Sequence, residues 1–203
     1  GEGGVYVCSK EFLTGLRKLC DERDIALILD EVQCGMGRTG TIMTYFQYDI
    51  LPDILCLAKG IGAGFPMGAF VANKKFAVAM EPGDHGSTYG GNPMAGQACR
   101  TVFKILEDTK MIDHVQDISE YLIEKLDDLQ EEFPCIKERR GLGLMIGLEF
   151  DKPVKDIVKT CLDLGLIVVT AGPHVVRMLP PFITTEKDVD QAIAILKEAI
   201  EKN

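Results

Sequence analysis

The stretch at residues 52–69, PDILCLAKGIGAGFPMGA, carries the clearest information about the fold. Its apolar run at residues 54–58 is typical of a buried strand, and the run ends at Lys59 among glycines. A second apolar run, residues 25–29, ends in the same way at Asp30. Because α/β sheets place ligands at the carboxyl ends of their strands, we expect Asp30 and Lys59 to mark a binding site.

The sequence around these runs alternates between helical and strand patterns. Ser9 can cap a helix whose apolar residues recur at helical spacing, and a third strand is expected at residues 68–72. Further helices are expected over residues 93–106 and 112–133. Continuous apolar strands separated by helices predict an α/β fold with a parallel sheet covered on both faces.

The pattern changes after Pro134, where short alternating strands replace the long helices. This change indicates a smaller α+β unit, so we place a boundary near residues 108–112 and expect two domains, 1–110 and 111–203. The strands of the second domain are expected at residues 142–150, 166–170 and 175–179, and its helices at 154–164 and 186–200.

The composition is that of an ordinary globular chain. Of the 203 residues 46% are hydrophobic and 26% charged, and 22 Lys and Arg against 31 Asp and Glu give a formal net charge of −9. Nucleic acids and anionic membranes require a concentrated positive surface, so we expect neither as a partner. No apolar stretch approaches the roughly 20 residues that cross a bilayer.

Seven cysteines are spread singly along the chain, with no CxxC pair and no histidines at zinc spacing. We therefore expect no metal site. Dispersed thiols in apolar runs are typical of small buried hydrophobic residues in a reducing compartment, which favours the cytoplasm. Structural roles are expected for His85, His114 and His174, and Arg38 is expected to order the glycine turn at residues 35–40.

Lys59 and Asp30 each allow a structural and a chemical interpretation. Lys59 can extend to solvent from a strand end, or it can be a desolvated amine that forms a Schiff base. Asp30 can cap the next loop, or it can be a buried anion facing a cationic ligand. Together they favour chemistry, because pyridoxal phosphate (PLP) needs a lysine for its aldehyde and a carboxylate that keeps its ring nitrogen protonated.

Three blocks carry a resemblance to a known family: LILDEVQCGMGRTG (27–40), PDILCLAKGIGAGFPMGA (52–69) and HGSTYGGNPMA (85–95). They resemble the signatures of the class III, or subgroup II, PLP-dependent aminotransferases, and with VRMLPPF (176–182) the chain is most similar to the acetylornithine aminotransferase branch. The resemblance implies the fold-type I, aspartate aminotransferase-like architecture. Residues 1–110 would be the C-terminal part of the PLP-binding large domain, and residues 111–203 the C-terminal small domain.

The resemblance also implies roles for the residues that hold the cofactor. Lys59 resembles the Schiff-base lysine, which also moves the proton at the substrate Cα. Asp30 resembles the partner of the pyridinium nitrogen, and Gln33 the side chain that binds the phenolic oxygen. Val32 would pack on the ring. Thr88 resembles the threonine that binds the cofactor phosphate of the other subunit of a homodimer; a simple Ser/Thr turn or cap is the structural alternative.

Three further residues resemble the family's substrate-binding groups. Ser87 is similar to a neighbour of the substrate. Arg177, in an otherwise apolar strand, is similar to the arginine that binds a substrate α-carboxylate. Glu2 is similar to the gate glutamate, which pairs with that arginine while the amino donor is bound and releases it for 2-oxoglutarate. A solvated residue in a frayed terminal segment is the alternative for Glu2.

The implied reaction is transamination of N-acetylornithine with 2-oxoglutarate, giving N-acetylglutamate 5-semialdehyde and glutamate, as in arginine biosynthesis. Ornithine, 4-aminobutyrate and succinylornithine are alternative amino donors. A racemase or aminomutase, and a non-catalytic C-terminal module, are alternatives of other classes. The chain lacks the phosphate loop, the stacking aromatic residue and a further arginine of the family's N-terminal half. It is therefore interpreted as the second half of a subunit, and alone it is expected to bind PLP weakly or not at all and to be inactive.

Overall fold

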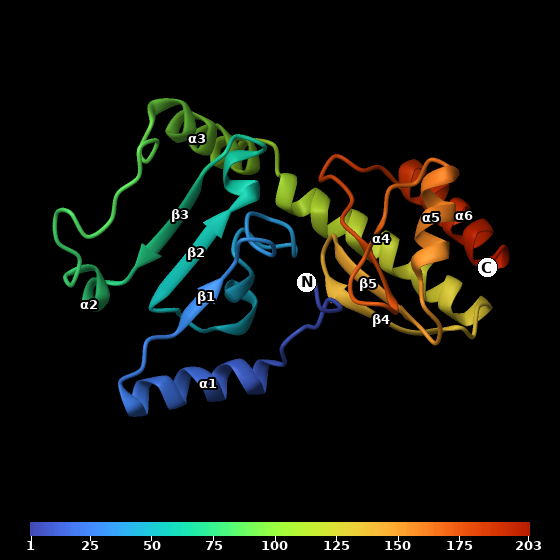
Figure 1. The fold of residues 1–203 in the computed structure, drawn as a ribbon, viewed down its shortest axis with the longest axis horizontal. Coiled ribbons are helices and arrows are strands. Elements are labelled where there is room, and N and C mark those ends of the chain that lie inside the picture. Colours follow the sequence, from blue (N-terminus) through green and yellow to red (C-terminus); the bar gives the residue numbers. More distant parts are fainter. The chain divides into compact units, whose positions relative to one another are not determined.

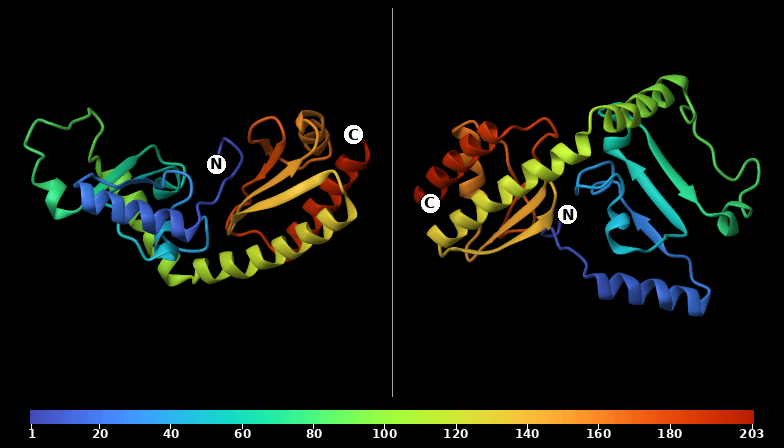
Figure 2. Two further views of the ribbon diagram at one scale, coloured as in Figure 1. Left: turned by 90° about the horizontal axis from the view of Figure 1, so that it is seen from below. Right: turned by 180° about the vertical axis from the view of Figure 1, so that it is seen from behind.

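The computed structural model describes residues 1–203, which form two compact units (Figures 1 and 2). The main division falls between Met111 and Ile112. Two short segments, Gly1–Val7 and Arg38–Gly40, group with the C-terminal residues rather than with their neighbours in the sequence. We name the units after their strands: the β1–β3 unit comprises Cys8–Gly37 and Thr41–Met111, and the β4–β7 unit comprises Gly1–Val7, Arg38–Gly40 and Ile112–Asn203.

The β1–β3 unit contains a three-stranded sheet in the order β1-β2-β3. Strand β1 runs parallel to β2, as expected, but β2 and β3 are antiparallel, so the prediction of a parallel sheet is wrong for the third strand. Only residues 59–67 join β2 to β3, which is shorter than a parallel crossover needs. The elements of the unit are α1 (Lys10–Arg23), β1 (Ile28–Asp30), η1 (Thr44–Tyr48), β2 (Ile54–Ala58), η2 (Lys59–Gly62), β3 (Gly68–Ala72), α2 (Lys74–Ala77) and α3 (Pro93–Asp108).

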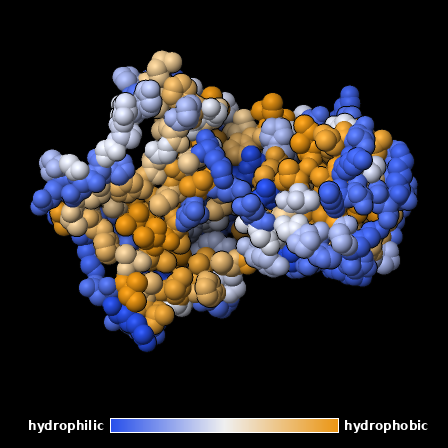
Figure 3. Space-filling model, in the orientation of Figure 1, coloured by the Kyte–Doolittle hydropathy of each residue, from blue (hydrophilic) through white to orange (hydrophobic).

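The sheet of the β1–β3 unit is not covered on both faces within this chain. Ile28 is 55% exposed, Val71 58% and Phe70 41%. Figure 3 shows apolar surface over this part of the chain. The expectation of full coverage is therefore wrong for these residues, although the ring of His85 lies 5.5 Å from the Phe70 ring, measured between centroids.

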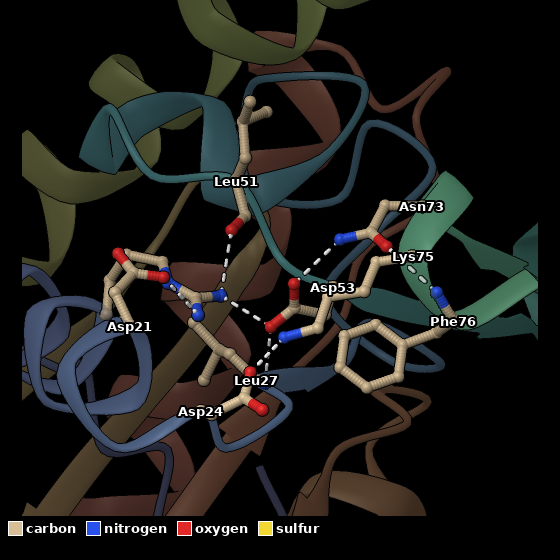
Figure 4. A network of polar contacts seen from close by, with 9 residues as sticks. Asp21, Asp24, Leu27, Leu51, Asp53, Asn73, Lys75 and Phe76 are labelled. Carbon is tan, nitrogen blue, oxygen red and sulfur yellow. Dashed lines mark hydrogen bonds and ion pairs between the residues drawn. The ribbon is translucent and has the colours of Figure 1, made fainter.

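A polar network around Asp53 fixes the start of β2 (Figure 4). Its carboxylate accepts hydrogen bonds from Arg17 Nη1 of α1 at 2.8 Å, from the Leu27 backbone N–H at 2.8 Å and from Asn73 Nδ2 at 2.7 Å. Helix α1 begins as predicted, since Ser9 Oγ accepts from the Phe12 N–H at 3.1 Å. One half-buried aspartate therefore joins helix α1 to both ends of the β2–β3 hairpin.

The β4–β7 unit is an antiparallel sheet in the order β4-β5-β7-β6 with helices packed against it. Its core includes Ile146, Leu148, Val176 and Leu126, all 0% exposed. Strand β4 was not expected, because its residues KERR are charged and only one face of the strand is covered by helices. The elements are α4 (Met111–Glu132), β4 (Ile136–Leu142), β5 (Met145–Phe150), α5 (Lys155–Asp163), β6 (Val169–Thr170), β7 (Val175–Met178) and α6 (Glu186–Glu201).

Of the seven free cysteines only Cys20 and Cys161 are buried, whereas Cys8 is exposed and the rest are half-buried. The expectation of buried thiols therefore holds for two of them. Burial raises the pKa of the Cys161 thiol to about 11, which keeps it protonated at neutral pH. No helix is long and apolar enough to cross a membrane.

Candidate active site

Asp30 and Lys59 lie at the same edge of the sheet in the β1–β3 unit. Strands β1 and β2 are parallel neighbours, with Asp30 in register with Cys56. Asp30 is the last residue of β1, and Lys59 directly follows the last residue of β2. The carboxyl ends of the two strands therefore bring an amine and a carboxylate to one side of the sheet, which is where α/β proteins bind ligands.

The backbone at Lys59 is unusual. Its φ of 48° lies in the left-handed region, which a residue with a long side chain rarely adopts. The next residue, Gly60, packs closely: a Cβ there would lie 3.1 Å from Met36 Cβ of the neighbouring glycine turn. Strained backbone of this kind is concentrated at functional sites, where it fixes the direction of a side chain.

Asp30 and Lys59 are both exposed in this chain, so the burial expected for their chemical interpretation is not present in these residues. Asp30 Oδ1 accepts a hydrogen bond from the Val32 N–H at 2.9 Å, which closes a tight turn directly after β1. The second oxygen of the carboxylate has no partner in the chain. Asp30 therefore fulfils the structural interpretation with one oxygen and keeps the other available for a ligand.

Gln33 presents an unsatisfied polar group beside this turn. Its Oε1 atom is buried and has no hydrogen-bond partner. Buried polar atoms in proteins are almost always hydrogen-bonded, so an orphan needs an explanation. A rotation of 180° about the last torsion exchanges the oxygen and the NH2 group, so this amide can either accept from or donate to a ligand.

Glu31, between Asp30 and Val32, is a structural residue that the sequence did not reveal. It is 3% exposed, and its carboxylate accepts from the Thr44 N–H at 2.7 Å and the Tyr45 N–H at 2.8 Å, at the start of η1. Burial raises the pKa of Glu31, although these two hydrogen bonds lower it in part. Gly35 is required beside it, because a Cβ there would lie 2.8 Å from the Glu31 carbonyl oxygen.

Replacing Glu31 by alanine is expected to lower the free energy of unfolding by about 2–4 kcal/mol, because the buried N–H groups of Thr44 and Tyr45 would lose their acceptor. Urea denaturation measures the change. Glu22→Ala is the control: Glu22 is an exposed residue of α1 with only a 3.8 Å ion pair to Lys18. It should cost less than about 0.5 kcal/mol. Equal costs for the two variants would contradict the role of Glu31.

Ser87 and Thr88 lie on an exposed loop that precedes α3. The Ser87 carbonyl accepts from the Gly90 N–H at 3.1 Å, which forms a backbone turn in which neither hydroxyl takes part. Asn92 caps α3 by accepting from the Ala95 N–H at 2.9 Å. Neither hydroxyl has a partner in the chain, which leaves both side chains available to an anion.

Arg177 and Glu2 belong to the β4–β7 unit, whereas the other predicted site residues belong to the β1–β3 unit. Arg177 lies in β7 between two buried residues, and its Nε and Nη1 atoms are buried without partners. Glu2 is exposed, and it does not supply a partner for these two Arg177 atoms. An unpaired guanidinium in an apolar strand requires an anionic partner, since burying an uncompensated charge is costly.

Arg38 and His114, both expected to be structural, bind backbone carbonyls, but the Arg38 side chain contacts residues after β4 and β7 and not the glycine turn at residues 35–40. Arg38 donates from Nη1 to the carbonyls of Leu144 at 3.2 Å and Pro180 at 2.5 Å, and burial lowers its pKa. His114 Nε2 lies 2.9 Å from the Thr184 carbonyl oxygen. The chain contains no group of three or more His, Cys, Asp or Glu side chains that could hold a metal ion.

Comparison with known proteins identifies the family. The family model "Aminotransferase class-III" matches residues 1–200. The acetylornithine aminotransferase of Clostridium acetobutylicum is 46% identical over 201 residues, covering 98% of this chain and 52% of that protein. Among solved structures, the N-acetylornithine aminotransferase of Stenotrophomonas maltophilia superposes with a TM-score of 0.89 at 36% identity, covering 100% of this chain and 54% of that one.

A second solved structure bears on the cofactor. The ornithine aminotransferase of Toxoplasma gondii, whose active site is partially occupied by PLP, superposes with a TM-score of 0.91 at 31% identity, covering 100% of this chain and 49% of that one. The chain belongs to the class III aminotransferase family, and its fold-type I architecture is confirmed. It spans about half the length of the relatives that it matches.

Proposed function

We propose that this chain forms the C-terminal half of an aminotransferase subunit that transfers the amino group of N-acetylornithine to 2-oxoglutarate. The observation that carries the proposal is the placement of Asp30 and Lys59 at the carboxyl ends of two neighbouring parallel strands, with the orphaned Gln33 amide in the turn after the first of them. The choice of donor is supported by the acetylornithine aminotransferases at 42–46% identity. Arginine biosynthesis in the cytoplasm is the corresponding setting.

The described residues fit PLP, since the orphaned Gln33 amide and the free oxygen of Asp30 match its polar groups. Lys59 would hold its aldehyde carbon, Asp30 its ring nitrogen, Gln33 its phenolic oxygen, and Val32 a face of the ring. When bound, PLP supplies an electron sink for the substrate Cα. Lys59 Nζ would then remove and return the proton at that carbon.

Arg177 and Glu2 would select the substrates. The guanidinium of Arg177, two of whose nitrogens are buried without a partner, suits a charge-assisted hydrogen bond to a substrate carboxylate. Glu2 would neutralise Arg177 while the amino donor is bound. Ser87 would contact substrate, and Thr88 would bind the cofactor phosphate of the other subunit in a homodimer; the exposed loop and unpartnered hydroxyls support both assignments.

We infer that the full-length subunit is needed for activity. Asp30 and Lys59 are exposed in this chain, and aminotransferase chemistry requires a site from which water is excluded. The 203 residues alone should therefore bind PLP weakly and show no turnover. Robust transamination by the isolated chain would contradict this inference.

Steady-state kinetics with the full-length subunit test the proposed substrate. N-acetylornithine is expected to give the highest kcat/KM when compared with ornithine, 4-aminobutyrate and succinylornithine, with 2-oxoglutarate as the acceptor. A preference for one of the other donors would assign a different aminotransferase activity. Failure of 2-oxoglutarate to accept the amino group would instead favour a racemase or aminomutase.

A further inference from the structure

Two arginines flank a glycine across three strands of the β4–β7 unit. Gly147 of β5 is in register with Arg140 of β4 on one side and with Arg177 of β7 on the other. Residues directly opposite each other in antiparallel strands direct their side chains to the same face of the sheet. Arg140, Gly147 and Arg177 therefore form one row on one face.

This face is the one that the helices leave uncovered. The alternate residues Ile146, Leu148 and Val176 are 0% exposed and belong to the core formed with the helices, so they point to the opposite face. Arg139, next to Arg140, also points that way, because it pairs with Asp127 of α4 at 2.5 Å. The row of Arg140, Gly147 and Arg177 lies on the helix-free side.

The segment Gly1–Val7 covers this row. Val5 is 3% exposed, and a Cβ on Gly147 would lie 3.0 Å from Val5 Cβ. The missing side chain of Gly147 therefore leaves the space that Val5 fills. Val5 has a φ of 57°, a conformation that a β-branched residue almost never adopts without strong external restraint.

Arg140 supplies a restraint of this kind. Its Nε donates to the Gly4 carbonyl at 2.8 Å, and its guanidinium lies under the Tyr6 ring at 4.2 Å. Its Nη1 donates to Glu149 at 2.5 Å and to Glu138 at 2.6 Å. Only 10% of the Arg140 side chain is exposed. One buried arginine thus binds the residues on both sides of Val5.

The two arginines of the row differ in their pairing. Arg140 is neutralised by two carboxylates, although its Nη2 atom is buried without a partner, whereas Arg177 forms no ion pair and has two such atoms, Nε and Nη1. The charge of Arg140 is thus balanced within the chain, whereas the charge of Arg177 is not. Arg140 instead contacts Gly4 and Tyr6 of the segment that carries Glu2.

We propose that Arg140 is a positioning residue that fastens the Gly1–Val7 segment over the sheet through the Gly4 carbonyl, and so holds Glu2 on the face of Arg177. Glu2 is three residues from Val5, the point where the segment is wedged against Gly147. The consequence for substrates rests on the proposed function, in which Glu2 and Arg177 select between amino donor and 2-oxoglutarate. The attachment of the Gly1–Val7 segment by Arg140 does not depend on the proposed function.

Hydrogen exchange followed by mass spectrometry tests the fastening in the full-length subunit. Arg140→Met should raise the exchange rate of the peptide containing Gly4 and Val5 by about tenfold or more, because a charged hydrogen bond to that backbone is lost. Arg139→Met is the matched control, since it removes a neighbouring ion-paired arginine from the other face. It should leave this peptide unchanged. Equal exchange in wild type and Arg140→Met would overturn the proposal.

Arg140→Lys separates charge from backbone binding. Lysine can keep an ion pair with Glu149 but has no equivalent of Nε at the Gly4 carbonyl. The proposal predicts faster exchange of the same peptide in this variant as well. Wild-type protection in Arg140→Lys would show that charge alone is sufficient, and would overturn the role of the Gly4 hydrogen bond.

Steady-state kinetics of the same variants test whether the position of Glu2 affects the selection between amino donor and 2-oxoglutarate. With Glu2 released, the KM for the amino donor should rise by about tenfold in Arg140→Met, while the KM for 2-oxoglutarate should change by less than about twofold. Arg139→Met should change neither. Equal effects on both KM values would overturn the link to substrate selection. If the wild-type subunit does not transaminate, the proposed function fails, and the exchange data still decide whether Arg140 fastens the segment.

Discussion

Lys59→Ala is expected to reduce transamination by the full-length subunit at least about a thousandfold, because one side chain is assigned both the covalent hold on the cofactor and the proton transfer at the substrate Cα. The backbone supports this assignment. Lys59 follows β2 with a φ of 48°, and the close packing of Gly60 against Met36 fixes the turn that directs its side chain. The rate of glutamate formation from 2-oxoglutarate measures the loss.

Lys74→Ala is the matched control for this variant. Lys74 is an exposed lysine at the start of α2, in the same unit, and it has no hydrogen bond or ion pair in the chain. Its removal should leave the rate within about twofold, as is usual for surface substitutions. A rate for Lys59→Ala within tenfold of wild type would contradict the role of Lys59.

Asp30→Asn is expected to lower kcat by about 150-fold to 5,000-fold, since removing one partner of an ion pair with a desolvated ring nitrogen costs roughly 3–5 kcal/mol. Asparagine keeps the oxygen that accepts from the Val32 N–H, so the turn after β1 should remain intact. The variant therefore removes the negative charge of Asp30 without breaking the hydrogen bond that forms the turn after β1.

Two measurements separate this effect from a change in folding. The free energy of unfolding of Asp30→Asn should lie within about 1 kcal/mol of wild type, because the substitution preserves the one hydrogen bond that the Asp30 side chain makes in this chain. The variant should also bind PLP more weakly in a titration of the full-length subunit. Wild-type kcat in a folded variant would contradict the assignment of Asp30 to the ring nitrogen.

Local signals in the sequence were sufficient for much of the site. The apolar runs that end at Asp30 and Lys59 predicted neighbouring strand ends, and the parallel pairing of β1 and β2 brings them to one edge. The cap at Ser9 also lies where the sequence placed it, and α3 begins at Pro93, the first residue of a predicted helix. These features depend on residues close together in the chain, so composition and spacing are enough to reveal them.

Features set by long-range contacts could not be predicted in this way. The return of β3 antiparallel to β2 depends on the short link at residues 59–67, and strand β4 is hidden because its charged residues face ion-pair partners. The Glu31 carboxylate binds N–H groups 13 and 14 residues away. Likewise, the alignment of Gly147 with two arginines is a matter of strand register, which alternation alone does not fix.

The attachment site of the cofactor shows directly whether Lys59 is the lysine that binds PLP. The full-length subunit is incubated with PLP, treated with borohydride to make the bond to lysine permanent, and digested for peptide mass mapping. We expect one modified peptide, the one that contains Lys59, and no modified peptide in Lys59→Ala. A pyridoxyl group on a different lysine, or unchanged labelling in Lys59→Ala, would contradict the account.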